Sequence, residues 1–418
     1  MEIKRDSLLQ RLLDLRHNGM IKVVTGMRRC GKSYLLFNLF SNALKAEGVD
    51  DAHIIQVNLE DRRNKSLRDP DNLLAYIDSR LKDEKMHYVL LDEVQLVSEF
   101  EDVLNSYLQV NNADLYVTGS NARFLSKDVI TEFRGRGLEV RVHPLSFREI
   151  RDAKPDEPIE KLWIEYITYG GLPQVLTMLS EQDKVDYLKG LFKHTYLKDI
   201  KERYDIKLDG DLEELICTLA STIGGLTNPR KLADTFRSMK KSTISQDTIK
   251  AYIDYLQDAF IIERALRFDI KGKRYIDTPS KFYFEDLGLR NALLNFRQVE
   301  RTHLMENAIY NELRARGIAV DIGEVIWNTK DGEGKKIRKT LEVDFVCNQG
   351  YKRSYIQSAF SIPDDEKRDQ ELQSLRRIDD SFQKIVIVGD HSTRYQNDEG
   401  ILFMDIYDFL MDVESGIA

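Results

Sequence analysis

Cysteine, proline and histidine are scarce in this chain, and each scarcity excludes a class of protein. The 418 residues include 3 cysteines, 8 prolines and 7 histidines. Three cysteines that lie far apart cannot build the disulfide framework of a small secreted domain, and they fit a reducing compartment. No group of cysteines and histidines has the spacing of zinc ligands, so we expect no zinc enzyme. With so few prolines, and only 23 glycines, we expect no long flexible linkers.

Long apolar runs are missing as well. No window approaches the roughly 18 consecutive apolar residues of a membrane span. The opening stretch MEIKRDSLLQRLLDLR lacks the apolar core of a signal peptide. The formal net charge of -8 excludes a protein that is basic throughout, although it leaves room for a local basic face. These absences predict a cytoplasmic protein of two to three domains that does not contact membranes.

The first stretch of the chain, residues 1–155, alternates short apolar runs with helical segments. The runs lie at residues 21–26, 53–60, 88–94, 115–120 and 138–145. Three of them are almost wholly apolar over four or more residues, which is typical of parallel strands buried on both faces. The alternation predicts a doubly wound α/β domain.

A phosphate-binding motif stands between the first predicted strand and the first predicted helix. The stretch GMRRCGKS, residues 26–33, fits the pattern G-x-x-x-x-G-K-[ST]. Gly26 and Gly31 allow the backbone amides to wrap around phosphates. Lys32 brings positive charge to the β and γ phosphates, and Ser33 offers a hydroxyl to Mg²⁺. The alternative is a chance match in a glycine-containing turn, against which the strand–loop–helix context argues.

Two carboxylates follow the apolar run YVLL at residues 88–91. Asp92 suits the shell of a Mg²⁺ ion that Ser33 also binds. Glu93 suits a general base that orients and activates a water molecule. An ordinary solvated acidic pair is the alternative, but the phosphate-binding loop makes ATP with Mg²⁺ the expected ligand. The strand at residues 115–118 ends in a run of small polar groups, which a simple turn also explains.

These motifs resemble those of the AAA-type ATPases, and more narrowly of the prokaryotic ATP-binding proteins that join such an ATPase to a C-terminal domain of unknown function. The shared stretches are TGMRRCGKS, LLDEVQ, VTGSNARFLS, FRGRG with PLSFREI, and YGGLPQVL. The resemblance implies an additional strand between the phosphate-loop strand and the acidic strand. Its tip then brings Ser120 or Asn121 to the γ phosphate and the attacking water. The resemblance favours Arg136 over Arg134 as a phosphate sensor or arginine finger, with a structural salt bridge as the alternative.

The predicted nucleotide contacts are the loop and the first helical turn: Gly26, Arg29, Cys30, Gly31, Lys32, Ser33 and Tyr34. Within the loop, Arg28 and Arg29 are expected to face solvent or a neighbouring subunit. Cys30 is interpreted as a small loop filler, with oxidation that blocks nucleotide binding as the alternative.

The middle region, residues 156–290, is mainly helical and contains a pattern similar to a winged helix. Ser245 is predicted to cap a helix whose apolar residues follow helical spacing. Residues 230–274 carry 11 lysines and arginines against 6 acidic residues, a net charge of 11 − 6 = +5. This local charge makes duplex DNA a candidate partner. The alternative is a winged helix used for packing or protein contact, because Asp247, Asp254 and Asp258 repel phosphate.

The last region, residues 291–418, resembles a restriction-endonuclease-like α/β fold in the order of its elements. Such a site uses a helix glutamate, a strand aspartate and an E-x-K stretch on the next strand. Glu306 and Asp344 match the first two, but the third reads Gln357-Ser358-Ala359. Loss of one carboxylate and of the lysine predicts an inactive nuclease-like domain.

Three functions follow from this reading. The first is an ATP-hydrolysing molecular switch that couples its nucleotide state to the C-terminal domains. The second is a DNA-binding regulator or defence component in which ATP sets conformation, and the third is a metal-dependent nuclease. A protein partner and an oligomeric state remain open at this stage.

Overall fold

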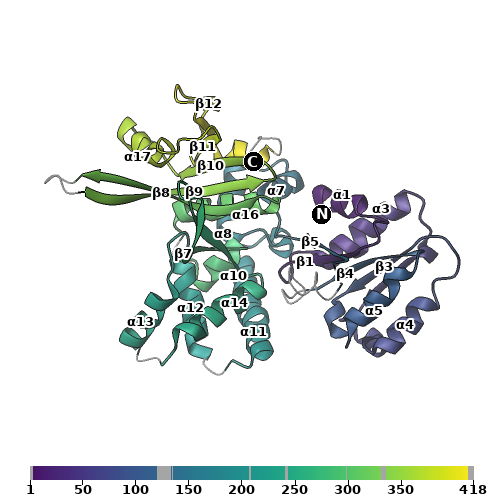
Figure 1. The fold of residues 1–418 in the computed structure, drawn as a ribbon. Helices are drawn as coiled ribbons and strands as arrows, with labels where there is room; N and C mark the ends of the chain where they lie inside the picture. Colours follow the sequence, from purple (N-terminus) through teal and green to yellow (C-terminus); the bar gives the residue numbers. More distant parts are fainter. Residues whose placement is uncertain are drawn as a thin grey trace.

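The computed structural model describes residues 3–119, 133, 135–206, 209–240, 243–297, 299–330 and 336–412. Within these residues the strands form two β-sheets, one of five strands and one of eight. Figure 1 shows the two sheets on opposite sides of the molecule, with a group of helices beside the larger one.

The five-stranded sheet is parallel, with the order β2-β3-β4-β1-β5. Its strands are β1 (Ile21–Thr25), β2 (Ile54–Asn58), β3 (His87–Asp92), β4 (Ala113–Thr118) and β5 (Gly137–Arg141). In β4, which lies between β1 and β3, Thr118 pairs with Val24 and Val117 with Leu91. The predicted additional strand is therefore confirmed. Because parallel strands end at one edge, the last residues of β1, β3 and β4 are neighbours.

Helices cover both faces of this sheet. They are α1 (Asp6–Asp14), a continuous helix made of α2 (Lys32–Tyr34), the π-helical turn η1 (Leu35–Phe40) and α3 (Ser41–Ala46), then α4 (Pro70–Asp78) and α5 (Phe100–Ser106). Short 3-10 turns connect them: η2 (Asp51–His53), η3 (Arg62–Arg68), η4 (Val94–Leu96) and η5 (Tyr107–Gln109). Leu36 of η1 packs with Leu90 on one face, and Ile77 of α4 packs with Leu91 on the other. Each such buried side chain contributes roughly 1.5–3 kcal/mol to stability.

A long helical region follows the first sheet. Its helices are α7 (Phe147–Ala153), α8 (Ile159–Tyr169), α9 (Pro173–Leu176), α10 (Glu181–Leu191), the π-helical η7 (Phe192–Tyr196), α11 (Leu197–Tyr204), α12 (Asp209–Ser221), α13 (Pro229–Lys240) and α14 (Gln246–Asp258). Met27 and Cys30 of the phosphate loop share one apolar core with Leu172 and Tyr196 of this region. In the part of the chain that the structure describes, no helix combines the length and the apolarity of a membrane span.

Local sequence signals explain α14 well. Ser245 accepts a hydrogen bond from the backbone N–H of Thr248 at 3.0 Å and so caps the helix, as predicted. The buried residues of the helix are Ile249, Tyr252, Ile253 and Leu256. Their spacing places them on one face, which packs on α13 and β6.

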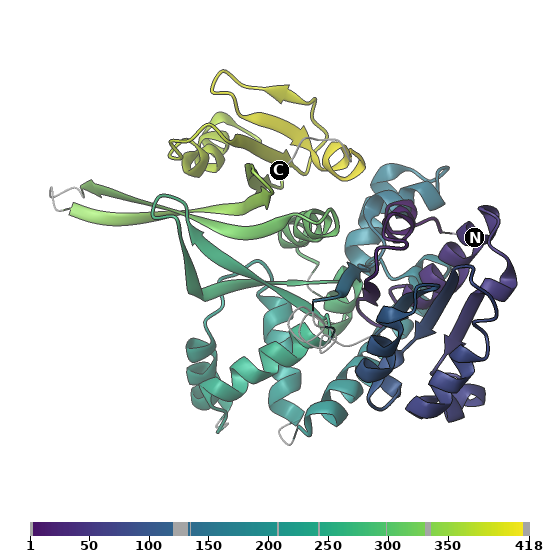
Figure 2. The same ribbon diagram turned by 45° about the vertical axis from the view of Figure 1, so that its right-hand side comes forward.

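The eight-stranded sheet is mixed, with the order β12-β13-β11-β10-β9-β8-β6-β7. Its strands are β6 (Ile262–Asp269), β7 (Arg274–Phe284), β8 (Ala319–Lys330), β9 (Lys336–Gln349), β10 (Lys352–Ala359), β11 (Gln383–Val388), β12 (Tyr395–Gln396) and β13 (Leu402–Asp405). β6 pairs in parallel with β8, so the sheet spans the predicted boundary at residue 290. The described parts of β8 and β9 extend beyond the rest of the sheet in both views (Figures 1 and 2).

Helices also cover the second sheet on both sides. These are α15 (Leu287–Leu293), α16 (Arg301–Ala315), α17 (Asp365–Leu375) and α18 (Ile406–Met411). Ile309 of α16 packs with Ile356 of β10 in one core, and Leu375 of α17 packs with Tyr355 in another. Successive residues of β10 therefore face opposite layers, as a strand requires.

Candidate nucleotide-binding site

The loop between β1 and α2 has a backbone that favours glycine at both glycine positions of the motif. The φ angle is 140° at Gly26 and 102° at Gly31. A Cβ atom at Gly26 would lie 2.1 Å from the carbonyl oxygen of Val142, so a larger residue does not fit there. Gly31 is the N-cap residue of α2. The loop therefore leads directly into a helix, whose N-terminus attracts anions.

Lys32 extends back across this loop. Its ammonium group donates hydrogen bonds to the carbonyl oxygens of Gly26 and Met27, both at 2.9 Å. The side chain is buried. A positive charge is thus held at the point where the backbone turns, which is where the loop can hold phosphate groups.

Asp92, at the end of β3, is the centre of a hydrogen-bond network. Its Oδ1 atom accepts hydrogen bonds from Ser33 Oγ at 2.8 Å and from Thr118 Oγ1 at 2.6 Å. Burial raises the pKa of Asp92, and the two hydroxyl groups oppose this rise. Hydroxyl and carboxylate oxygens are the ligands that Mg²⁺ prefers. Ser33 and Asp92 therefore fit a Mg²⁺ ion beside the loop.

Glu93 follows Asp92 in an unusual backbone conformation. Its φ angle is 56°, which is uncommon for a residue other than glycine. Its backbone N–H donates to Thr118 Oγ1 at 2.9 Å, and its Oε2 atom accepts from the side chain of Gln95. The side chain is half-buried at the edge of the sheet where β1 also ends. This arrangement suits a base that acts on a water molecule beside the loop.

Thr118 is the site residue that sequence reasoning missed. It ends β4 and hydrogen-bonds both acidic residues of the neighbouring strand. Its place as the last residue of a predicted strand was the sequence feature that could have identified it as a site residue. The predicted residues Ser120 and Asn121, and the alternative arginine Arg134, lie outside the described residues.

Arg136 lies at the other edge of the sheet. It precedes β5, whose first residue, Gly137, pairs with Ile21 at the start of β1, while the phosphate loop follows the end of β1. Five strand residues separate the two edges, which is roughly 15 Å. Arg136 is exposed there. Its position excludes contact with a phosphate in its own loop, and a role toward a neighbouring chain stays a prediction.

The remaining loop positions differ in exposure. Arg28 is paired with Asp199 of α11 at 2.9 Å while its side chain is 37% exposed, so its predicted place toward solvent or a neighbouring subunit stays a prediction. Arg29 and Tyr34 are exposed beside the loop. Cys30 is fully buried, and burial raises the pKa of its thiol, so little reactive thiolate forms. This favours the interpretation of Cys30 as a loop filler.

Side chains from outside the loop fix its backbone. The hydroxyl of Tyr196 in η7 donates to the carbonyl oxygen of Arg28 at 2.6 Å. The guanidinium of Arg5 donates to the carbonyl oxygen of Cys30 at 3.1 Å. A Cβ atom at Gly31 would be 3.8 Å from Pro173, the first residue of α9. The helical region is therefore in direct contact with the candidate nucleotide site.

The exposed face of α14 does not have the charge of a DNA-reading helix. Its exposed charged residues are Asp247, Lys250 and Asp254. Asp258, on another side, accepts a hydrogen bond from the hydroxyl of Tyr204 at 2.7 Å, which fixes α14 to α11. An acidic face repels phosphate. This geometry supports the packing alternative, and DNA binding stays a prediction.

The carboxylates of the predicted nuclease-like site surround a lysine. Glu306 accepts hydrogen bonds from Lys281 Nζ at 2.9 Å and from the hydroxyl of Tyr283 at 2.7 Å. Lys281 also pairs with Glu342 at 2.7 Å. A buried ammonium thus neutralises the carboxylates that would hold a metal ion. Sequence reasoning missed Lys281 because it is on β7, far from Glu306 in the sequence.

The position predicted to match E-x-K does not complete this cluster. Gln357 contacts Glu371 and Ser374 of α17, on the face of the sheet opposite α16. Asp344 instead accepts a hydrogen bond from the backbone N–H of Ser358 at 2.8 Å. Burial, and then the charge of Glu306, raise the pKa of Asp344 to about 8. Inactivity as a nuclease stays a prediction, which this arrangement supports.

Replacing Asp344 by asparagine is expected to increase the free energy of unfolding at neutral pH by about 2–5 kcal/mol. The folded chain keeps this carboxyl protonated up to pH 8 or so, while the unfolded chain ionises it near pH 4, so its contribution to stability falls as pH rises between those values. Asparagine is neutral throughout and still offers an oxygen to Ser358. Denaturant unfolding at about pH 5 and about pH 8 measures the difference, which should grow with pH. A variant no more stable than the wild type at the higher pH would contradict the expectation.

Comparison with protein families divides the chain into two matched parts. Residues 18–151 match the model of an AAA domain. Residues 160–300 match a domain of unknown function, DUF8612. The first match contains the phosphate loop, the acidic pair and all five strands of the first sheet.

Two relatives extend the similarity beyond these parts. An uncharacterized protein of Haemophilus influenzae is 32% identical over 414 residues, which is 98% of each chain. An uncharacterized protein of Methanocaldococcus jannaschii is 29% identical over 359 residues, 83% of this chain and 76% of that one. Among solved structures, the Walker-type ATPase of Pyrococcus abyssi aligns with a TM-score of 0.51 and 16% identity over 70% of this chain and 96% of that one. That likeness shows a shared fold.

Proposed function

Because the chain belongs to the prokaryotic AAA-type P-loop ATPases, we propose that it hydrolyses Mg·ATP and uses its nucleotide state as a switch. The observation that carries the proposal is the network of Ser33, Asp92 and Thr118, with Glu93 beside it. Homology supports ATP binding and hydrolysis in general. The roles of individual residues and the coupling to the rest of the chain are our proposals.

The residues of the site have separate roles in this proposal. The loop amides and Lys32 bind the phosphates, and Ser33 with Asp92 holds Mg²⁺, which neutralises charge on the phosphate oxygens when bound. Glu93 orients the attacking water and accepts its proton. Through its hydroxyl group, Thr118 fixes the carboxylate of Asp92 and the backbone N–H of Glu93.

Contacts from the phosphate loop toward the second sheet support the switch. Pro173 lies beside the loop, and Gly171, two residues earlier, donates its backbone N–H to Asp286 at 2.8 Å. Asp286 also caps α15 by accepting from the N–H of Leu289 at 2.8 Å. A Cβ atom at Gly170 would lie 2.4 Å from the Asp286 carboxylate, so this fit is close. A shift of the loop can therefore reach α15.

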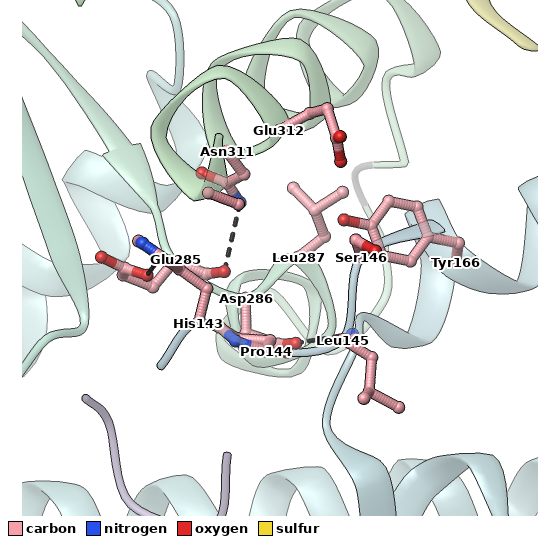
Figure 3. Close-up of a pocket in the computed structure, with 12 residues that line it drawn as sticks. His143, Pro144, Leu145, Ser146, Tyr166, Glu285, Asp286, Leu287, Asn311 and Glu312 are labelled. Atoms are coloured by element: carbon pink, nitrogen blue, oxygen red, sulfur yellow. Dashed lines mark hydrogen bonds and ion pairs between the residues drawn. The ribbon is translucent and has the colours of Figure 1, made fainter. Parts of the chain in front are cut away.

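Glu285, directly after β7, makes a second connection between the two sheets. It pairs with Arg141 of β5, and its Oε2 atom lies 3.0 Å from His143 Nδ1. Burial acts to raise the pKa of Glu285, but the charges of Arg141 and His143 outweigh it and lower the pKa to about 2. Asn311 of α16 donates to the backbone carbonyl of Glu285 at 3.1 Å. Figure 3 shows this junction, where the segment after β5 meets α15 and α16.

The division of the chain at about residues 155 and 290 is also a proposal. The second sheet takes β6 and β7 from before residue 290. In a switch, these two strands are the elements that carry a movement of Glu285 and Asp286 into the sheet. The winged-helix-like helix α14 then packs against β6 and against α13 instead of reading DNA.

Replacing Tyr196 by phenylalanine is expected to weaken the switch without abolishing ATP binding. The change removes the hydroxyl that holds the Arg28 carbonyl and keeps the packed ring. One such hydrogen bond contributes about 0.5–1.5 kcal/mol, so ATP affinity should change by less than about tenfold. Hydrogen exchange measures the switch: ATP should alter the protection of β7, α15 and α16 in the wild type, and much less in the variant.

Tyr107→Phe is the matched control for this experiment. The Tyr107 hydroxyl is also in a hydrogen bond, with Asp78 Oδ1 at 2.8 Å and the carbonyl oxygen of Leu74 at 3.2 Å, but it lies under α4, away from the loop. The control should keep the exchange response of the wild type. If ATP changes no protection beyond residue 155 in the wild type, the coupling is absent and the proposed switch is wrong, whatever the ATPase activity.

A further inference from the structure

Two histidines and an aspartate meet at the edge of the first sheet that lies opposite the phosphate loop. His53 ends η2 directly before β2, His87 begins β3, and Asp83 precedes β3 by four residues. The two strands pair with Ile54 opposite Tyr88, so the histidines before them are neighbours. Among the described residues, His53, Asp83 and His87 form a group whose potential ligand atoms all lie within 4.8 Å of one another.

The spacing of these atoms is close to that of a metal shell. His53 Nε2 lies 3.0 Å from Asp83 Oδ2 and 3.1 Å from Oδ1. Two ligands that are each about 2.1 Å from a tetrahedral zinc ion lie roughly 3.4 Å apart. The ring centroids of the two histidines are 4.7 Å apart. The His53–Asp83 pair therefore needs to open by only a few tenths of an ångström to match this spacing, and the His87 ligand atom lies within 4.8 Å of both.

A hydrogen bond fixes the tautomer of His87. Its Nδ1 atom lies 2.8 Å from the carbonyl oxygen of Lys85. A carbonyl oxygen only accepts, so Nδ1 carries the hydrogen and Nε2 holds the lone pair that a metal requires. Metal-binding histidines commonly donate their second ring nitrogen to such a partner. The contact therefore prepares His87 as a ligand.

Burial orders the histidines and leaves the aspartate accessible. His53 is 8% exposed and His87 is 1% exposed, so neither ring loses much freedom on binding a ligand. The Asp83 side chain is 45% exposed, and its Oδ1 atom accepts from the N–H of Lys85 at 2.8 Å. Solvent can thus deliver an ion and supply the water that completes its shell.

We propose that His53, Asp83 and His87 bind one divalent transition-metal ion of the zinc type. Imidazole nitrogens suit zinc and its neighbours, whereas Mg²⁺ prefers oxygen ligands. The donor set therefore separates this ion from the Mg²⁺ of the proposed ATPase. His87 and Asp92 are opposite ends of β3, a strand of 6 residues, so the two sites lie roughly 17 Å apart. The ion joins the first residues of β2 and β3 to the loop before β3.

Calorimetric titration of the full chain with Zn²⁺ tests the site, after chelator treatment and in excess Mg²⁺ to occupy oxygen-rich sites. The wild type should bind one Zn²⁺ per chain and unfold at a higher temperature when Zn²⁺ is present. Asp83→Asn should bind at least about tenfold more weakly. Glu84→Gln, the same change at the next exposed residue of the loop, should bind as the wild type does.

Folding and ligand identity need their own controls. Without metal, the Asp83→Asn protein should unfold at nearly the wild-type temperature, because asparagine keeps an oxygen for the N–H of Lys85. With Co²⁺ in place of Zn²⁺, the absorption spectrum should show nitrogen and oxygen ligands and no thiolate band. Three results would each overturn the proposal: a wild type that binds no stoichiometric Zn²⁺, an Asp83→Asn protein that binds Zn²⁺ with the wild-type affinity, or a thiolate band in the Co²⁺ spectrum. If the group is only a His53–Asp83 ion pair, the wild type will show no stoichiometric Zn²⁺ binding.

Discussion

Replacing Lys32 by alanine is expected to weaken ATP binding by at least about 100-fold and to abolish phosphate release. The Lys32 ammonium is buried and makes 2.9 Å hydrogen bonds to two carbonyl oxygens of the phosphate loop. Each charge-assisted hydrogen bond from such a group contributes about 1.5–3 kcal/mol. In the complex with ATP, the ammonium is expected to make two such bonds to the phosphates. Their loss corresponds to a factor of about 10² to 10⁴ in ATP affinity. Calorimetry with ATP and Mg²⁺, and a phosphate-release assay, measure the two effects.

Lys45→Ala is the matched control for this substitution. Lys45 lies on α3, in the same continuous helix, and forms an exposed ion pair with Asp51 at 2.6 Å. Exposed pairs contribute at most about 1 kcal/mol, so this variant should keep both binding and turnover. If the Lys32 variant binds ATP as tightly as the Lys45 variant does, the loop is not a nucleotide site and the proposed function fails.

The first sheet and the centre of the candidate site could be predicted because their signals are local. Gly26, Lys32 and Ser33 belong to one stretch of eight residues, and the apolar run before Asp92 marks a buried strand. Parallel strands end at one edge, so the sequence alone brings Asp92 to Ser33, and their hydroxyl–carboxylate contact of 2.8 Å follows. The order of the strands came from family resemblance, and the pairing of β4 between β1 and β3 confirms it.

Contacts between distant segments account for most of what sequence reasoning did not reach. Lys281 and Glu306 are 25 residues apart, and His53 and Asp83 are 30 apart. No periodicity connects such pairs, since they meet only when strands and helices pack. Arg136 illustrates the same limit. Its Gly-Arg motif indicated a phosphate sensor, but the motif contains no information on which end of β5 it occupies.

The predicted boundary at residue 290 falls within the second sheet for a related reason. The strands β6 and β7 follow the helices of a winged-helix-like pattern, so they fall in the predicted middle region, residues 156–290. Arg267 of β6 instead pairs with Ile322 of β8 across more than fifty residues. A strand's own residues specify its alternation but not its partner. Glu285 and Asp286, at the end of β7, consequently lie between the two sheets, where no local signal marked them.

Replacing Glu93 by glutamine is expected to keep ATP binding and to reduce hydrolysis by about 10²- to 10⁴-fold, the usual contribution of a general base. Glutamine has nearly the same shape and still offers an oxygen to the side chain of Gln95, but it accepts no proton. The backbone bond from residue 93 to Thr118 Oγ1 at 2.9 Å is unaffected by the change. Magnesium and phosphate contacts should therefore survive. ATP affinity by calorimetry and phosphate release by a coupled assay separate the two properties.

Glu99→Gln controls for the chemical change, since Glu99 also has a positive φ of 53° and lies on the same segment before α5. It should hydrolyse ATP at the wild-type rate. Full hydrolysis by the Glu93 variant, with none by the Lys32 variant, would leave the ATPase in place but assign its base to another residue.

With the expected result, the Glu93 variant stays in its ATP-bound form for long enough to act as bait. Partners recovered from a lysate with ATP, and not with ADP or with the Lys32 variant, are then those that the ATP state engages, because both comparison samples lack bound ATP.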